Sequence, residues 1–404
     1  MSRFVLTDAA IERALAPGFE IAAPAGFVGQ VADAIATHPR RSGWLVLHPA
    51  TWPRQASLVA QLILLLVLLL TLAIGTLAIA SLTRRGVANG HVIVAMGTEL
   101  IDIDPTTASA RTLLTSDGDI FGVARSGDGG LISFWTASGT TLEVVDSSGG
   151  NRRRVAANIT PPPVGQGQID VWSPDNRYLA AGVVAGGDNR ILVVDVSSGT
   201  GELIGPPGAG NPLWSPDAKL LAFSYPDDGQ SVLAVMRPDG SGLRKISGDL
   251  GDLNASGPNN WSPEGAWVYF GAERDGYDVS YIYRADVEGG GSEQLTFDMI
   301  TAAPALSPDG TKVAYSSWER GVGIESLWLM DAAGANQRLL LASALNDGWS
   351  NDGQFLLAEW RPSGAAYELL VLRPDGPYRQ TLMTFDGGCY AKCVDSLAWG
   401  QPRP

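Results

Sequence analysis

Any catalytic chemistry of this chain has to draw on few residue types, because its 404 residues include only three histidines, His38, His48 and His91. No histidine follows residue 91. The long C-terminal part therefore lacks the base of a Ser–His–Asp triad, the partner of a Cys–His pair and a histidine metal site. A Gly-x-Ser-x-Gly nucleophile motif does not occur either. We therefore expect a protein that is not an enzyme and has no catalytic residue, metal or cofactor.

Carboxylates remain available, because a glycoside hydrolase needs only two acids. Aspartate is also an ordinary turn residue, so a structural role is favoured for most of these acids. The segments "SDGDI" at Ser116 and "SGDGG" at Ser126 have neither the spacing nor the acidic last residue of a calcium loop. Carboxylate-dependent hydrolysis of envelope sugars stays open as an alternative function. Its candidate acids are Asp117, Asp119, Asp275, Asp278, Glu319 and Glu359.

The only two cysteines, Cys389 and Cys393, lie four residues apart in "GGCYAKCVD". Two thiolates cannot complete a tetrahedral zinc site, and no histidine lies near them in the sequence. A small disulfide loop is the simpler interpretation, and it requires an oxidising compartment.

The charge of the chain is unevenly distributed. Residues 1–85 hold seven arginines and four acidic residues, whereas residues 86–404 hold 21 basic and 38 acidic residues. A domain with a net charge of −17 repels nucleic-acid phosphates. We therefore expect no nucleic-acid partner.

A membrane anchor is predicted for residues 55–83, because no charged residue occurs between Arg54 and Arg84. About 20 apolar residues span a bilayer as a helix. A buried core helix and a cleaved signal peptide are the alternatives, but more than 50 residues precede the apolar run. The flanking arginines and the cysteine pair favour a cytoplasmic tail of residues 1–54, with two short helices, and an extracytoplasmic C-terminal domain.

One short phrase recurs along residues 86–404, as in "WSPDNRYLAAG" at Trp172 and "LSPDGTKVAY" at Leu306. Its serines are spaced by 42, 47, 45 and 43 residues, a period typical of propellers. Ser-Pro-Asp-Gly suits a type I turn, and the alternating residues that follow suit a strand. A tryptophan before the turn is expected to pack as a wedge between repeats. The serines of the phrase are Ser173, Ser215, Ser262, Ser307 and Ser350, and the tryptophans are Trp172, Trp214, Trp261, Trp349 and Trp399.

A second piece, a strand that runs into a polar turn as in "LVVDVSSG" at Leu192, occurs seven times. With the first phrase it makes four antiparallel strands, which is one propeller blade. The sequence thus predicts an all-β, seven-bladed propeller over residues 86–404, with six or eight blades as alternatives. Residues 91–115 and 394–400 are expected to complete the first blade from both chain ends, which leaves no free sheet edge.

The phrase W-S-P-D-G-x-x-[LIV]-A-[FY], followed by [LIV]-x-x-x-D-x-x-G, resembles the repeat of TolB-type β-propellers. Similar repeats form the propeller half of dipeptidyl peptidase and prolyl oligopeptidase relatives. The resemblance covers roughly residues 90–400 and implies the fold. TolB itself is periplasmic and carries an additional α/β domain for which the pattern leaves no room, so its role is not carried over.

The short turns should crowd one face of the propeller, and the other face should carry the longer loops. Aromatic residues beside arginines on those loops are typical of recognition surfaces, although the same residues could pack on a neighbouring blade. The candidate binding residues are Trp135, Tyr225, Arg274, Tyr277, Trp318, Arg320, Trp360 and Arg361.

Together these features predict a single-pass membrane protein whose propeller binds a protein, peptide or glycan in the cell envelope without catalysing a reaction. A transmembrane regulator is an alternative, in which the propeller senses a ligand and the tail of residues 1–54 acts like a membrane-bound anti-sigma factor.

Overall fold

The computed structural model describes residues 90–136, 140–157, 159–160, 170–274, 280–297, 300–318, 325–361, 366–385 and 396–399. The predicted tail and membrane segment, the two cysteines, Tyr277 and Arg320 lie outside these ranges. Within them the secondary structure is all β, and none of the described residues belongs to a helix that could cross a membrane.

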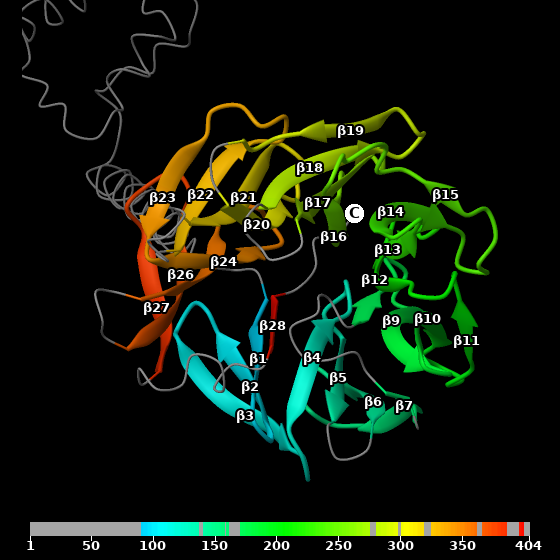
Figure 1. Cartoon of the computed structure of the whole chain (residues 1–404). Coiled ribbons are helices and arrows are strands. Elements are labelled where there is room, and N and C mark those ends of the chain that lie inside the picture. Colours follow the sequence, from blue (N-terminus) through cyan, green and yellow to red (C-terminus); the bar gives the residue numbers. More distant parts are fainter. Residues whose placement is uncertain are drawn as a thin grey trace, which may run out of the picture. The chain divides into compact units, whose positions relative to one another are not determined.

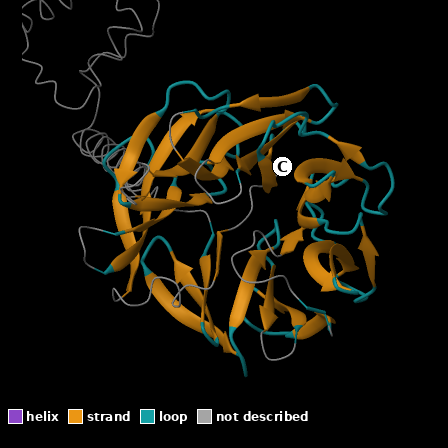
Figure 2. Ribbon diagram, in the orientation of Figure 1, coloured by secondary structure: helices purple, strands orange, loops and turns teal. Residues whose placement is uncertain are grey.

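The described strands form seven four-stranded antiparallel sheets arranged around a central axis (Figure 1). Only strands and loops occur among them, as Figure 2 shows. The prediction of a seven-bladed propeller is therefore confirmed.

The blades are numbered here from 1 to 7 along the chain, and each is described from its innermost strand outward. The innermost strands are β28 (Ser396–Trp399), β4 (Ile120–Arg125), β8 (Asp170–Trp172), β12 (Gly210–Trp214), β16 (Asn254–Trp261), β20 (Ile300–Leu306) and β24 (Ala344–Trp349). The second strands are β1 (Val92–Met96), β5 (Leu131–Thr136), β9 (Tyr178–Ala185), β13 (Leu221–Asp227), β17 (Trp267–Glu273), β21 (Lys312–Trp318) and β25 (Leu356–Trp360).

The third strands are β2 (Glu99–Asp104), β6 (Thr141–Asp146), β10 (Asp188–Asp195), β14 (Gln230–Met236), β18 (Ser280–Asp286), β22 (Glu325–Asp331) and β26 (Tyr367–Leu372). The outermost strands are β3 (Ser109–Thr115), β7 (Arg153–Ala156), β11 (Gly201–Ile204), β15 (Arg244–Lys245), β19 (Gly291–Gln294), β23 (Arg338–Ala342) and β27 (Arg379–Phe385).

The recurring phrase forms the turn between the first and second strands of a blade. In blade 3 the Ser173 hydroxyl donates to Asp175 Oδ1 at 2.5 Å and accepts from the Tyr178 N–H at 2.8 Å. The Asn176 N–H closes the turn on the Ser173 carbonyl at 2.8 Å. The same Ser–Asp pair occurs at Ser126, Ser215, Ser307 and Ser350.

These turns and the turns between third and fourth strands share one face of the propeller, which we call the tight-turn face. The hairpins between second and third strands and the connections between blades lie on the opposite, loop-rich face, because strand direction alternates within each blade.

Four tryptophans of the phrase are buried where one blade packs on the previous one, namely Trp172, Trp214, Trp261 and Trp349. The indole N–H of Trp172 donates to Ser133 Oγ of blade 2 at 3.0 Å. Trp261 Nε1 donates to the Leu213 carbonyl at 3.2 Å, and Trp349 Nε1 donates to the Ala305 carbonyl at 2.8 Å. Each of these side chains thus fills the space between two blades and bonds across it.

Both ends of the repeat array contribute to blade 1, where β28 pairs with β1 from Val92↔Trp399 to Ala95↔Ser396. This is the pairing expected from the sequence. It closes the ring with main-chain hydrogen bonds.

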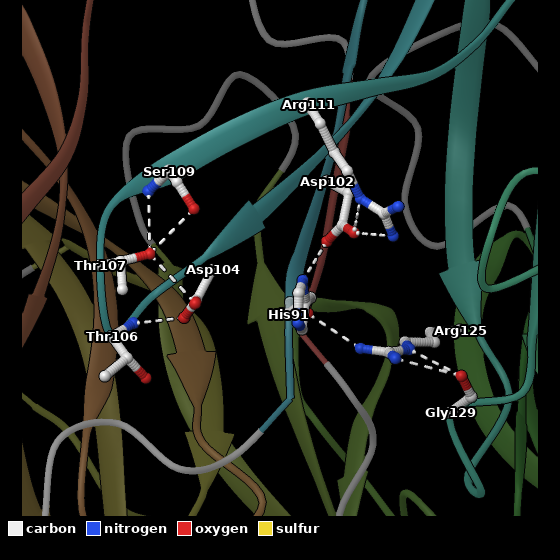
Figure 3. A network of polar contacts seen from close by, with 9 residues as sticks. All are labelled: His91, Asp102, Asp104, Thr106, Thr107, Ser109, Arg111, Arg125 and Gly129. Carbon is white, nitrogen blue, oxygen red and sulfur yellow. Dashed lines mark hydrogen bonds and ion pairs between the residues drawn. The ribbon is translucent and has the colours of Figure 1, made fainter.

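A polar network lies beside this closure (Figure 3). Asp102 is 3% exposed, and its carboxylate contacts His91 Nδ1 at 2.5 Å and accepts from Arg111 Nε at 2.9 Å and Nη2 at 2.8 Å. Arg125 of blade 2 donates from Nη1 to the His91 carbonyl at 3.0 Å and from Nη2 to the Gly129 carbonyl at 3.1 Å. The network therefore joins blades 1 and 2 at the start of the described chain.

Candidate functional site

The innermost strands of several blades carry a β-bulge before they reach the tight-turn face. In β24 the register shifts between Asn346 and Gly348, which leaves Asp347 in the bulge. A bulge bends its strand and re-aims side chains, and such bulges often lie next to functional sites. Register shifts also occur in β4 (Phe121/Ala124), β12 (Gly210/Leu213), β16 (Ala255/Gly257 and Pro258/Asn260) and β20 (Ala302/Ala305).

The bulged segments of blades 4 to 7 surround a pocket of about 830 Å³, which we call the axial pocket. It extends toward the loop-rich face, because it also takes in the ends of second strands on that side, such as Glu273 of β17. The volume lies within the range of small-molecule and peptide sites. The lining consists of residues 208–211, 256–260, 302–305 and 346–348, with Gly182, Val183, Asn189, Ser224 and Glu273.

Asparagine side chains fix the geometry of this lining. Asn211 Nδ2 donates to the Ser256 carbonyl of the next blade at 3.1 Å. Asn260 Oδ1 accepts from the Leu306 N–H at 2.9 Å, and Asn346 Nδ2 donates to the Ala303 carbonyl at 2.9 Å. Neighbouring innermost strands are thereby tied together at the level of the pocket.

Two of the residues that line the pocket are ionisable, Glu273 and Asp347, and both are acids. Asp347 is partly buried, and its Oδ2 atom is covered and makes no hydrogen bond within the described part of the chain. Burial raises the pKa of Asp347 well above its usual range, and the nearby Glu359 carboxylate raises it further. Burial, followed by the charge of Glu325, also raises the pKa of Glu359.

The axial pocket thus offers amides, main-chain groups and carboxylates, and its lining contains no histidine, cysteine, lysine or arginine. Such a surface can form hydrogen bonds and attract positive charge. No cluster of three or more potential His, Cys, Asp or Glu metal ligands occurs within the described ranges.

Trp135, one of the predicted binding residues, does not lie on a recognition surface. Its side chain is 0% exposed and belongs to the same buried cluster as Trp172 and Phe121. The prediction was wrong because both faces of a propeller blade are packed against neighbouring blades, so a tryptophan near a strand end can be part of the core.

The other described candidates lie at the loop-rich ends of strands but outside the axial pocket. Arg274 forms an ion pair with Asp252, Nη2 to Oδ2, at 2.8 Å. Arg361 donates from Nη1 to the Tyr367 hydroxyl at 2.9 Å, and its guanidinium carbon lies 4.8 Å from the centroid of the Tyr367 ring.

Two further candidates also have contacts within the propeller. Trp360 Nε1 donates to the Ala342 carbonyl at 3.2 Å, and the Tyr225 ring packs at 5.8 Å from that of Phe223. Trp318 ends strand β21 and is partly buried. A binding role for these residues stays a prediction.

Sequence reasoning missed the axial pocket, although a signal was present. The residues just before the recurring tryptophan are polar or small, as in "GPNNW" and "NDGW", where a regular buried strand would carry larger apolar residues. Asp275, Asp278 and Glu319 lie outside the described residues. Of the described acids singled out in the sequence, Glu359 lies beside Asp347.

Comparisons with known proteins agree with this architecture. A family model described as a TolB beta propeller domain matches residues 128–401. An uncharacterized protein of Agrobacterium fabrum is 28% identical over 158 residues, which are 37% of this chain and half of that relative's length.

Among solved structures, TolB from Acinetobacter baumannii is 20% identical, with 78% of this chain and 80% of that chain covered and a TM-score of 0.47. An oligogalacturonate lyase from Vibrio parahaemolyticus is 14% identical, with 66% of this chain and 88% of that chain covered and a TM-score of 0.53. The similarity to the oligogalacturonate lyase shows the propeller fold alone, and this fold therefore also occurs in an enzyme.

Proposed function

Because this chain belongs to the TolB β-propeller family, we propose that it is a non-enzymatic binding module that takes up part of a protein partner in the axial pocket. The observation that supports this best is the lining of the pocket, which provides hydrogen-bonding groups without a nucleophile–base pair. A segment of extended peptide suits such a pocket, because its main-chain groups can pair with asparagine side chains and with main-chain groups of the bulges.

Cross-linking from inside the pocket tests this proposal. Asn259 lines the pocket, and Asp239 lies in an exposed turn on the tight-turn face. A photoreactive amino acid in place of Asn259 should yield a specific protein adduct in cells, and the same residue in place of Asp239 should not. Adducts from both positions in equal amount, or from neither, would contradict a partner in the pocket.

We also propose that residues 55–83 anchor the protein in a membrane and place the propeller outside the cytoplasm. The uncharged run between Arg54 and Arg84 supports this arrangement. Alkaline phosphatase fused after residue 404 should be active, because it folds only where disulfides form. An inactive fusion, together with a fluorescent cytoplasmic reporter at the same position, would contradict the orientation.

Hydrolysis of glycans is the second candidate, since a carboxyl group whose pKa is raised, as that of Asp347 is, can serve as a general acid. Purified protein should leave envelope oligosaccharides unchanged if the binding proposal is right. Turnover that disappears in both Asp347→Asn and Glu273→Gln would instead establish an enzyme.

A further inference from the structure

The most unusual group in the described propeller is the Asp347 carboxyl. The β24 bulge places it in the wall of the axial pocket, between Asn346, which bonds to blade 6, and Gly348, whose φ of 112° suits glycine. Its Oδ2 atom has no hydrogen-bond partner in the described chain. A buried acceptor of this kind is costly unless a ligand satisfies it.

The charges around Asp347 are all negative in the contacts that the structure describes. The charge of Glu359, in β25, raises the pKa of Asp347. The charge of Glu325, in β22, in turn raises the pKa of Glu359. Glu273 is the other acid of the lining. None of the described ion pairs joins Asp347 or Glu359 to a lysine, arginine or histidine. Among the described residues, the Asp347 carboxyl therefore has no cationic partner from the protein itself.

The rest of the lining is suited to hold a chain that carries a cation. The side chains of Asn189 and Asn259 line the pocket and make no hydrogen bond with other described residues. At Gly348 no side chain covers the main chain, because a Cβ atom there would meet nothing within 4 Å. A neutral peptide backbone could pair with these groups while one charged side chain reaches Asp347.

We propose that the axial pocket selects a lysine or arginine side chain of its peptide partner, with Asp347 as the counter-charge. This proposal rests on the function proposed above and specifies the chemistry of the ligand. It also predicts a link to protons. In the empty pocket, burial and then the charge of Glu359 raise the pKa of Asp347, whereas a bound cation lowers that pKa. Binding should therefore release a proton and become tighter as the pH rises.

Calorimetry with the full chain and short blocked peptides tests the proposal. The probes are acetyl-Gly-Lys-Gly-amide and acetyl-Gly-Arg-Gly-amide, with acetyl-Gly-Gln-Gly-amide as the neutral counterpart. We expect the cationic peptides to bind at least about tenfold more tightly, as for other buried charge pairs. Titrations in two buffers of different ionisation enthalpy should show proton release. Unblocked Gly-Gln-Gly carries a free amino terminus and no basic side chain, so it tests whether an amino terminus can supply the cation.

Asp347→Asn should reduce the affinity for the cationic peptides by about tenfold or more and abolish proton release. The matched control is Asp188→Asn, which changes an exposed acid near the pocket that does not line it and should leave both readouts unchanged. Thermal unfolding of each variant verifies that it is folded. A merely structural role of Asp347 would alter stability without removing the pH dependence.

Equal binding of the glutamine and lysine peptides would overturn the charge selection but leave the proposed binding function intact. Unchanged affinity in Asp347→Asn, or no binding of either cationic peptide at millimolar concentration, would also overturn it. If the photoreactive residue at position 259 gave no adduct, the binding function itself would be contradicted. Failure of the charge selection and failure of the binding function are therefore distinguishable.

Discussion

At the scale of single residues, two kinds of carboxylate in the propeller respond to pH in opposite ways. Several turn aspartates, among them Asp195 and Asp331, have lowered pKa values because hydrogen bonds and cations favour their charged form. The hydrogen bond from Lys312 lowers the pKa of Asp331 most, and the hydrogen bond from Asn336 lowers it next. Asp347 and Glu359 have raised pKa values because burial disfavours the charge. Turn acids with a lowered pKa therefore stabilise the fold at neutral pH, whereas Asp347 and Glu359 destabilise it there.

Asp347→Asn should accordingly raise the free energy of unfolding at pH 7. An acid whose pKa is raised on folding contributes stability below its unfolded value, near pH 4, and loses it as the pH rises toward the folded value. Urea denaturation from pH 4 to pH 8 should show a gain in the variant that grows with pH. A gain of constant size at every pH would refute the assignment, and Asp188→Asn serves as the control.

Asp331→Asn should have the reverse effect. The lowered pKa of Asp331 stabilises the folded state above the unfolded value, and this contribution disappears as the pH falls through the folded value. The variant should be less stable than the natural protein at pH 7 and equal to it near pH 2. If Lys312→Met removes the same pH dependence, the ion pair with Asp331 is its source.

At the scale of elements, the recurring tryptophan shows how much one repeat position can differ between blades. Trp261 donates its indole N–H across the blade interface, to the Leu213 carbonyl. Trp214 occupies the same position, stacks on Tyr178 with ring centroids 6.3 Å apart, and has a buried N–H without a partner among the described residues. The apolar packing is common to both, and the hydrogen bond is not.

Phenylalanine at these two positions separates packing from hydrogen bonding. Trp261→Phe leaves the Leu213 carbonyl without its donor, whereas Trp214→Phe removes an N–H that has no described partner. We expect Trp261→Phe to lose about 1 kcal/mol more of unfolding free energy than Trp214→Phe. Guanidinium denaturation monitored by circular dichroism measures the difference, and equal losses would show that the indole bond contributes little.

The elements also show what the sequence can and cannot predict. Ser173 and Asp175 form a local turn, so their roles follow from neighbouring residues alone. Asp347 becomes part of a pocket only because bulges in four blades face one axis, and a bulge leaves little trace in a pattern of alternating residues. Trp135 was wrongly predicted to be a surface residue for a related reason, since the exposure of its side chain depends on how the neighbouring blade packs.

At the scale of the whole molecule, the period of the repeat was sufficient to predict the number of blades. The closure of blade 1 also followed from the unpaired strands at both ends of the repeat array. The ring has no free innermost edge at that point, because β28 occupies the edge of β1 (Figure 1).

Removal of residues 396–404 should therefore destabilise the whole propeller. It deletes β28 and exposes the hydrogen-bonding groups of β1, an edge that favours aggregation. Size-exclusion chromatography should show larger species, and thermal unfolding should begin at a lower temperature. A shorter deletion that retains Trp399 is the control, and identical behaviour of the two deletions would contradict a structural role for the closure.

The pairing of β1 with β28 also bears on how the protein is made. Val92 and Trp399 are separated by more than 300 residues, so the ribosome completes β1 long before its partner strand exists. At roughly 5–20 residues per second, this interval lasts roughly 15–60 s. During that time the nascent chain carries an incomplete blade, and a chaperone that shields β1 would act before translation ends.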